Sequence, residues 1–215
     1  MSAVRAVVFD FNGTLSDDEP VLCEIYVELF AEHGKPLSAQ EYFDHLAGHS
    51  EIEIMSRWLG ADHPDLDGVI AERIARYRAR VSDGSTVHEH VREAVRYAAE
   101  RVPVAVVSGA ARAEIEPVLA GAGLAPLVRA IVADDDVVEG KPHPEGYLRA
   151  LELLGAPAPG DVLAFEDTEA GVASAKAAGL RVFAKRGTLD PQRLLRADEI
   201  VDGIDVALMR RVLAR

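Results

Sequence analysis

The chain has 215 residues, of which 49% are hydrophobic and 27% charged, a composition that suits one globular domain or one domain with a modest insertion. Its formal net charge of −13 argues against nucleic acid or an anionic membrane as the main partner. The single cysteine, Cys23, excludes an intrachain disulfide and a zinc site built from cysteines. A small anionic substrate is still compatible with this charge, because a metal ion and one lysine can reverse its sign locally.

The first residues show no export signal. The apolar run 6–9 is too short for the hydrophobic region of a signal peptide. No apolar run in the sequence approaches the length of a membrane span. We therefore expect a cytoplasmic protein with no membrane partner, which is a monomer or a weak dimer.

The first predicted element is a strand at 4–11, a short β-branched run of the kind that is covered on both faces. No convincing strand follows between residues 17 and 81. Four helical patterns occupy that segment instead, and a capping box formed by Ser38 and Glu41 is predicted to begin the second of them. The four predicted helices are 19–33, 39–46, 51–59 and 66–80.

Strands and helices then alternate as far as residue 184. This alternation predicts βαβ units and a doubly wound, Rossmann-like parallel sheet. A short strand near 200–201 and a closing helix from Asp205 complete the chain. The predicted strands are 102–107, 128–132, 161–165 and 181–184, and the predicted helices are 88–100, 113–120, 145–154 and 169–178.

The predicted organisation is an α/β core with a helical cap inserted after its first strand. The core consists of residues 1–16 and 82–215, and the cap of residues 17–81. A parallel sheet binds ligands at the carboxyl ends of its strands, so we expect the cap to form a lid over that edge.

Polar residues follow four of the predicted strands. Asp10 ends the first, Ser108 ends the second, Lys141 lies in the loop after the third, and Glu166 with Asp167 ends the fourth. Taken alone, each has an ordinary structural explanation: an Asx-turn, a serine cap, a solvent-exposed lysine, or a helix N-cap by Asp167. Taken together, they can hold Mg²⁺ and a phosphoryl group, because oxygen ligands without cysteine or clustered histidine favour Mg²⁺ over zinc.

These motifs resemble those of the haloacid dehalogenase-like superfamily, in its helical-cap branch of phosphoglycolate phosphatase-like and β-phosphoglucomutase-like enzymes. The matching motifs are DFNGTL at 10–15, Ser108, Lys141 within GKPHP, and FEDT at 165–168, and the likeness covers nearly the whole chain. The resemblance implies a Mg²⁺-dependent phosphatase that acts through an aspartyl-phosphate. Its substrate would be a small phosphorylated metabolite, such as a sugar phosphate or a phosphoglycolate-like compound.

The resemblance also implies a role for each residue of the site. Asp10 would be the nucleophile, and Thr14 would orient its carboxylate. Mg²⁺ would be held by Asp10, by the backbone carbonyl of Asn12 and by Asp167, with Glu166 beside them. The residues implied for catalysis are Asp10, Asn12, Ser108 and Lys141, and those implied for phosphate binding are Gly13, Thr14, Ser108, Gly109 and Lys141.

Position 12 departs from the family pattern, which has an aspartate there that protonates the leaving oxygen and later activates water. Asn12 cannot shuttle a proton, and the loss of general acid–base help costs about 10²–10⁴-fold in rate. Three explanations stay open: an engineered variant, a natural and slower member of the family, or a different reaction. A second class of function is a catalytically impaired or trapped protein that binds a phosphorylated metabolite.

Two related reactions fit the sequence less well. A phosphonatase needs a cap lysine as a Schiff base, and Lys35 is the sole lysine of the cap segment. A mutase of this branch has a histidine near position 22, where this chain has Leu22. Specificity should come from the loop 46–51, in which His49 and Ser50 are the candidate substrate-binding residues.

Overall fold

The computed structural model describes residues 3–214, so the ends of the predicted core segments, residues 1, 2 and 215, lie outside the described residues. All strand pairs are parallel, and the strand order is β3-β2-β1-β4-β5-β6. The direction of winding reverses between β1 and β4, and ligands bind at such a switch point. The predicted doubly wound α/β core is confirmed. The strands are β1 (Ala6–Phe9), β2 (Val104–Val107), β3 (Ala130–Val132), β4 (Val162–Glu166), β5 (Arg181–Lys185) and β6 (Glu199–Val201).

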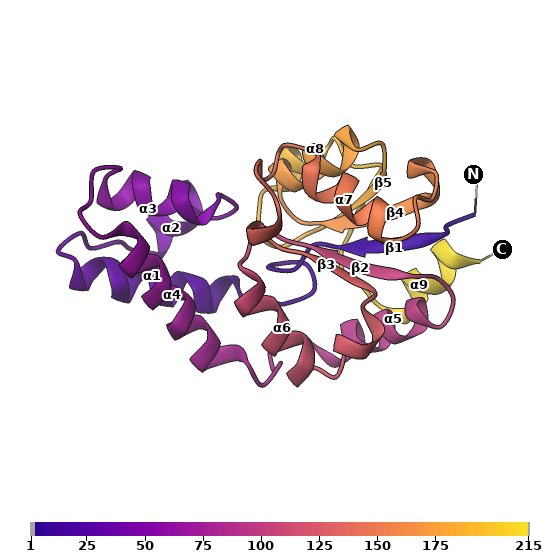
Figure 1. Ribbon diagram of the computed structural model, residues 1–215, viewed down its shortest axis with the longest axis horizontal. Coiled ribbons are helices and arrows are strands. Elements are labelled where there is room, and N and C mark those ends of the chain that lie inside the picture. Colours follow the sequence, from indigo (N-terminus) through magenta and orange to yellow (C-terminus); the bar gives the residue numbers. More distant parts are fainter. Residues whose placement is uncertain (1–2, 215) are drawn as a thin grey trace.

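Helices cover both faces of this sheet (Figure 1). Alternate residues of β1 point to opposite faces, as a strand requires: Val7 and Phe9 belong to one buried cluster, Ala6 and Val8 to the other. The first cluster also holds residues of α5, α6 and α9, and the second holds residues of α7 and α8. These helices are α5 (Glu89–Ala99), α6 (Arg112–Gly121), α7 (Glu145–Leu153), α8 (Glu169–Ala177) and α9 (Val206–Leu213).

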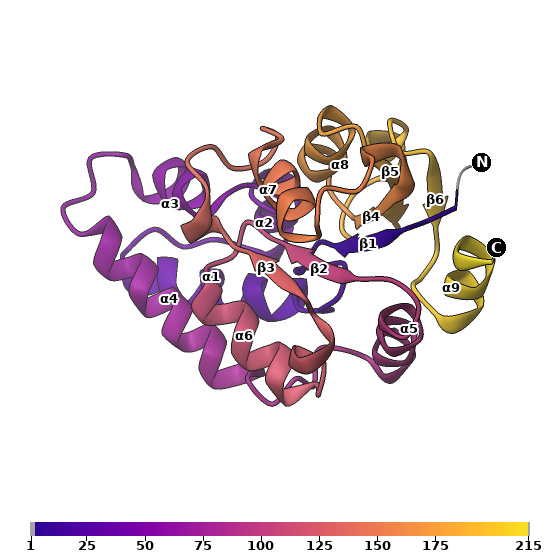
Figure 2. The same ribbon diagram turned by 45° about the vertical axis from the view of Figure 1, so that its right-hand side comes forward.

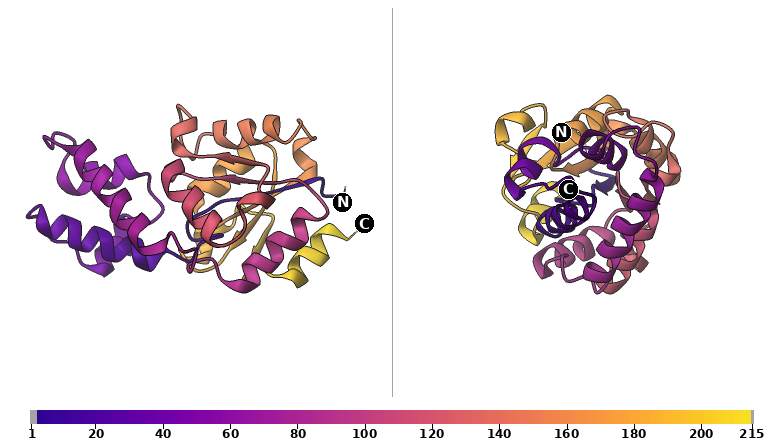
Figure 3. Two further views of the ribbon diagram at one scale, coloured as in Figure 1. Left: turned by 60° about the horizontal axis from the view of Figure 1, so that its bottom comes forward. Right: turned by 90° about the vertical axis from the view of Figure 1, so that its left-hand side faces the viewer.

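The remaining four helices lie between β1 and α5 in the chain and form a group of their own beyond one end of the sheet (Figures 1 and 3). The chain termini lie at the opposite end of the molecule (Figure 1). The predicted capping box of Ser38 and Glu41 is present, and Ser50 and Glu53 form a second one. The helices are α1 (Glu19–Glu32), α2 (Ala39–His45), α3 (Glu51–Leu59) and α4 (Leu66–Val81), each within two residues of its predicted bounds.

Gly84 fixes the path of the chain where it leaves this helical group and enters the core. Helix α4 packs against α6, and Figure 2 shows the two running side by side. Gly84 has a positive φ of 75°, and a Cβ there would collide with the backbone of Gly121 and Ala122. Within residues 3–214, no helix combines the length and the apolar character that a membrane span needs.

We expect Gly84→Ala to destabilise the protein more than Gly34→Ala. Both glycines have a positive φ, 75° and 70°, where an alanine costs about 1–2 kcal/mol. A Cβ on Gly34 meets no atom within 4 Å, whereas a Cβ on Gly84 meets rigid backbone. The midpoints of urea unfolding of the two variants measure the difference, and equal losses would contradict a close approach at Gly84.

Candidate active site

The carboxyl ends of β1, β2 and β4 open into one cavity of about 540 Å³. Five of the residues predicted for the site line its floor, and the helices α1 to α4 line the opposite end. The size falls in the range of about 300–1,000 Å³ that is usual for small-molecule sites. The floor residues are Asp10, Asn12, Ser108, Lys141 and Asp167.

The Lys141 ammonium group links three strand ends. Its Nζ atom lies 2.5 Å from Asp10 Oδ1 after β1, 2.6 Å from Glu166 Oε1 at the end of β4, and 3.2 Å from the Val107 carbonyl oxygen of β2. Burial opposes the charge of Lys141, but the two carboxylates more than offset this effect and raise its pKa. Lys141 is therefore a fixed cation at the floor of the cavity.

Glu166 is fully buried and acts mainly as an anchor for Lys141. Its Oε1 atom also accepts a hydrogen bond from the Tyr147 hydroxyl at 2.6 Å, and its Oε2 atom accepts one from the Asp167 backbone N–H at 3.3 Å. A Cβ on Gly171 would overlap this carboxylate. The position of the Glu166 carboxylate explains why position 171 is a glycine, because any larger side chain there would overlap it.

Asp167 is held by two threonine hydroxyls. Thr14 donates to its Oδ1 atom at 3.1 Å, and Thr188 donates to Oδ2. We expected Thr14 to orient Asp10, so this expectation was wrong about the partner: Thr14 is buried against Asp167 instead. A Cβ on Gly13 would collide with Asp167 Oδ2. The N-cap of α8 is Thr168 and not Asp167, which leaves the Asp167 carboxylate directed to the cavity floor.

Asn12 is tied to a second buried carboxylate, Asp18. The Asn12 amide donates from Nδ2 to Asp18 Oδ2 at 2.9 Å. Asp18 is completely buried and also accepts hydrogen bonds from the Gly13 backbone N–H and the Tyr77 hydroxyl. Burial raises the pKa of Asp18 to about 6 in spite of these donors. The side chain at position 12 thus donates a hydrogen bond to the Asp18 carboxyl group. An ionised aspartate at position 12 could not donate this hydrogen bond.

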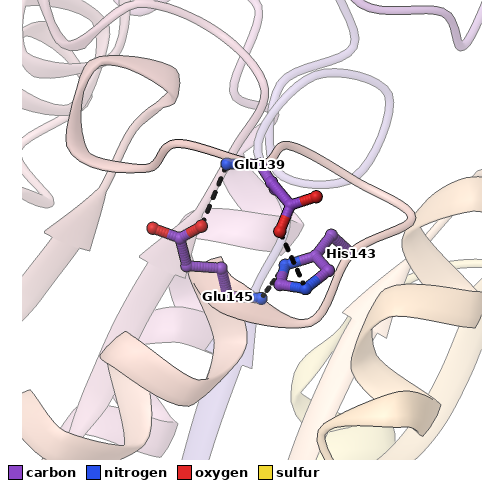
Figure 4. Close-up of side chains that lie close together, drawn as sticks. All are labelled: Glu139, His143 and Glu145. Carbon is purple, nitrogen blue, oxygen red and sulfur yellow. Dashed lines mark hydrogen bonds and ion pairs between the residues drawn. The ribbon is translucent and has the colours of Figure 1, made fainter.

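The loop that carries Lys141 is braced by its own side chains (Figure 4). Glu145 accepts hydrogen bonds from the backbone N–H groups of Val138 and Glu139 at 3.0 and 2.9 Å, and His143 pairs with Glu139 at 3.2 Å. Three potential ligand atoms of Glu139, His143 and Glu145 lie within 4.8 Å of one another. These groups are hydrogen-bonded within the loop (Figure 4), so we assign them to holding the loop.

A second group of carboxylates, Asp10, Glu166 and Asp167, is buried and also has its oxygens within 4.8 Å. Burial raises the pKa of Asp10 from 3.8 to about 6, against the attraction of Lys141 and with help from the charge of Asp167. Burial, followed by the charge of Glu166, raises the pKa of Asp167 to about 6. Lys141 offsets only part of this negative charge. The oxygen donors and their excess of charge therefore fit a divalent cation such as Mg²⁺.

The cap loop 46–51 lines the cavity and approaches the core at Thr168. A Cβ on Gly48 would lie 3.3 Å from Thr168 of the core. His49 and Ser50 both line the cavity. The Ser50 hydroxyl accepts the Glu53 backbone N–H at the start of α3, and the His49 ring lies 3.3 Å from Arg57 Nη1. Ser108 and Gly109 line the cavity from the core side.

Several residues of the site were not predicted from the sequence. Lys185 donates to the Gly13 carbonyl at 2.6 Å, and it ends β5, so the rule that located the other strand-end residues could have found it. Thr188, Tyr147 and Asp18 carry no comparable signal in the sequence, because only the fold places them against Asp167, Glu166 and Asn12.

Fold and site together define an α/β enzyme with a carboxylate–lysine pair at the switch point of its sheet. A family profile described as haloacid dehalogenase-like hydrolase matches residues 4–179. The chain belongs to this family, as its motifs indicate.

Similar proteins include phosphatases. Protein CbbY of Rhodobacter capsulatus is 33% identical over 91% of this chain and 89% of its own length. Validoxylamine A 7'-phosphate phosphatase of Streptomyces hygroscopicus subsp. limoneus is 29% identical over 92% of each chain. The crystal structure of CbbY from Rhodobacter sphaeroides in complex with phosphate superposes with a TM-score of 0.83 at 26% identity, covering 94% of this chain and 95% of that one. The fold, the family and these relatives make the chain a phosphoric monoester hydrolase.

We expect Mg²⁺ to raise the melting temperature more at pH 7.5 than at pH 5. The pKa values of Asp10 and Asp167 are raised from 3.8 to about 6, so the metal-free folded protein keeps protons that the unfolded chain releases. The contribution of protonated Asp10 and Asp167 to the folding free energy is therefore fully present below pH 4 and is lost as the pH rises through 6. Mg²⁺ binds the ionised carboxylates and should restore the stability that is lost when they ionise.

Thermal unfolding with and without Mg²⁺ at the two pH values checks this prediction. Asp167→Asn should reduce the Mg²⁺ effect at pH 7.5, whereas Asp202→Asn, whose side chain is 93% exposed, should leave it unchanged. A Mg²⁺ effect of the same size at both pH values would contradict the carboxylate site.

Proposed function

We propose that the chain is a Mg²⁺-dependent phosphatase that hydrolyses a small phosphorylated metabolite through an aspartyl-phosphate on Asp10. The observation that carries the proposal is the 2.5 Å contact between Asp10 Oδ1 and Lys141 Nζ at the floor of the cavity. A nucleophile that must attack a phosphate anion needs a cation beside it, and Lys141 is that cation.

In the first step, an oxygen of Asp10 forms a bond to phosphorus as the bond from phosphorus to the ester oxygen breaks. Lys141 orients the Asp10 carboxylate and screens its charge from the incoming phosphate. Ser108, which is 6% exposed and lines the cavity, is placed to donate a hydrogen bond to a phosphoryl oxygen. The ester oxygen leaves with the bonding electron pair and takes a proton from solvent water to become the alcohol, and the phosphoryl group stays on Asp10.

The side chains of Asp10 and Asp167 and the backbone carbonyl of Asn12 would hold Mg²⁺, which would neutralise charge on the phosphoryl oxygens. In the second step, water attacks the phosphorus of the aspartyl-phosphate and Asp10 is released. Asn12 cannot accept the proton of that water or give one to the leaving alcohol, so turnover is slow or limited to good leaving groups. The Asn12–Asp18 hydrogen bond supports a natural Asn12 that is part of the fold, rather than a single engineered substitution at position 12.

We further propose that residues 17–81 act as a cap that closes over the substrate. Support comes from the close approach of the Gly48 backbone to Thr168, where an added Cβ would lie 3.3 Å from the threonine side chain, and from the ion pair between Arg73 of α4 and Glu114 of α6. Closure would exclude water until the covalent intermediate has formed. The names of the relatives, which include a phosphatase of validoxylamine A 7'-phosphate, favour a phosphorylated carbohydrate-like substrate. A protein that binds such a metabolite without turnover is the second candidate, and Asn12 is the residue that favours it.

Phosphate release from a panel of small phosphomonoesters with Mg²⁺ tests the proposal. We expect steady release by the unmodified chain, and release by Asp10→Asn at the level of the buffer blank, because the attacking oxygen is lost. Asp202→Asn makes the same chemical change at an exposed position and should retain full activity. Absence of release from every ester would refute the phosphatase and leave the binding protein.

A reciprocal exchange at positions 12 and 18 should increase the rate more than Asn12→Asp alone. The single change places a carboxylate in the position of an amide that lies 2.9 Å from the buried Asp18, so the two acids repel each other or share one proton. Asn12→Asp with Asp18→Asn keeps one donor and one acceptor in contact and restores an acid–base group, which is worth about 10²–10⁴-fold.

The measurement is kcat for the single variants and the double variant with the best ester of the panel. A double variant that is no faster than Asn12→Asp would show that the two positions act independently. Circular dichroism of each variant checks that the fold is retained.

A further inference from the structure

Asp167, a Mg²⁺ ligand in the proposed function, accepts a hydrogen bond from a residue that no motif of the sequence indicates. Thr188 lies in the loop that follows β5, 21 residues further along the chain, and its hydroxyl donates to Asp167 Oδ2. Strand β5 pairs in parallel with β4, with Ala184 beside Glu166, so the two strands end side by side. The loop after β5 therefore returns across the end of β4 and brings Thr188 to Asp167.

Gly13 makes room for this contact. A Cβ on Gly13 would lie 2.6 Å from Thr188 Oγ1 and would overlap Asp167 Oδ2, so a larger residue at position 13 would push the two side chains apart. Asp167 is buried and Thr188 is half-buried. The turn after β1, the end of β4 and the loop after β5 thus meet at one closely packed point.

The hydrogen bonds to Asp167 leave positions on its carboxylate for a metal ion. An ionised carboxylate offers about four acceptor positions, two on each oxygen. Thr14 uses one position on Oδ1, at 3.1 Å, and Thr188 uses one on Oδ2. Donors on both oxygens fix the rotation of the carboxylate, which a single donor would leave free. Thr14 and Thr188 together therefore set the direction in which the remaining positions point.

A carboxylate at this place has a competing partner, because Lys141 is close. The Lys141 ammonium group contacts Asp10 and Glu166, and its charge also opposes the rise in the pKa of Asp167. An Asp167 side chain that was free to rotate would turn toward this cation. It would then be misdirected for a metal ion and would compete with Asp10 for the lysine. The Thr188 hydroxyl holds the carboxylate against this rotation.

We propose that Thr188 is a positioning residue for the Mg²⁺ site, whose hydroxyl holds the Asp167 carboxylate in the orientation that binds the metal. This inference rests on the proposed function, because that proposal makes Asp167 a Mg²⁺ ligand. It goes further, since it gives a role to the loop after β5, which none of the sequence motifs includes. A hydrogen-bond partner of a metal ligand contributes about 10–100-fold to metal affinity.

Two substitutions at position 188 separate the hydroxyl of threonine from its methyl group. Thr188→Val keeps the shape and removes the hydroxyl, whereas Thr188→Ser keeps the hydroxyl and removes the methyl group. Calorimetric titration of the metal-free protein with Mg²⁺ measures the dissociation constant without any substrate. We expect Thr188→Val to weaken Mg²⁺ binding about 10–100-fold, and Thr188→Ser to bind Mg²⁺ nearly as tightly as the unmodified chain.

Thr86→Val is the matched control. It makes the same change at a half-buried threonine whose hydroxyl contacts Ser16 at 2.7 Å instead of Asp167, and it should leave the Mg²⁺ affinity unchanged. An unchanged affinity in Thr188→Val would overturn the proposal. A greater loss in Thr188→Ser than in Thr188→Val would also overturn it, because packing of the methyl group would then be the cause. An equal loss in Thr86→Val would refute a specific effect of position 188.

The dependence of the rate on Mg²⁺ gives a second readout, which a general loss of structure would not reproduce. With p-nitrophenyl phosphate, Thr188→Val should need about 10–100-fold more Mg²⁺ for its half-maximal rate. Its kcat at saturating Mg²⁺ should stay close to that of the unmodified chain, because Thr188 acts through Asp167 and the bound metal then holds that carboxylate. A lower kcat with an unchanged Mg²⁺ requirement would contradict the assigned role.

Failure of this inference and failure of the proposed function can be told apart. If the unmodified chain binds no Mg²⁺, or if Asp167→Asn binds it equally well, the metal site of the proposed function is refuted and the role of Thr188 with it. If the unmodified chain binds Mg²⁺ and releases phosphate, but Thr188→Val has the same Mg²⁺ affinity, only the role of Thr188 is refuted.

Discussion

The contacts of one ammonium group determine the arrangement of the active site. Lys141 Nζ contacts Asp10, Glu166 and the Val107 carbonyl, and so it connects the ends of three neighbouring strands. Buried carboxylates at the edge of a parallel sheet would repel one another without it, and leaving one of them unpaired is costly. The Glu145 contacts that hold the lysine loop therefore also hold Asp10 in place.

Much of this arrangement could be predicted from the sequence, because it depends on local patterns. Apolar β-branched runs predicted the strands. The ends of those strands and the loops after them predicted Asp10, Ser108, Lys141 and Asp167 as candidate site residues. The partner of Thr14 could not be predicted, because Asp10 and Asp167 both end neighbouring strands and only the packed structure shows which is in reach. The contact of Asp18 with Asn12 could not be predicted for the same reason, because it depends on the conformation of the turn that follows β1.

The two ends of the cavity differ in chemical character. The floor combines a fixed cation with ionisable carboxylates, which suits a phosphate group together with a divalent ion. At the opposite end, Arg73 of α4 lies between the carboxyl groups of Glu51 and Glu114. The floor residues come from the core, whereas helices α1 to α4 line the opposite end of the cavity.

The Arg73–Glu114 ion pair joins the inserted helices to the core, and it is almost completely buried. Separating the two charges is favourable only if water solvates both as they part. Any motion that separated the inserted helices from the core would therefore require water to enter as this ion pair parts.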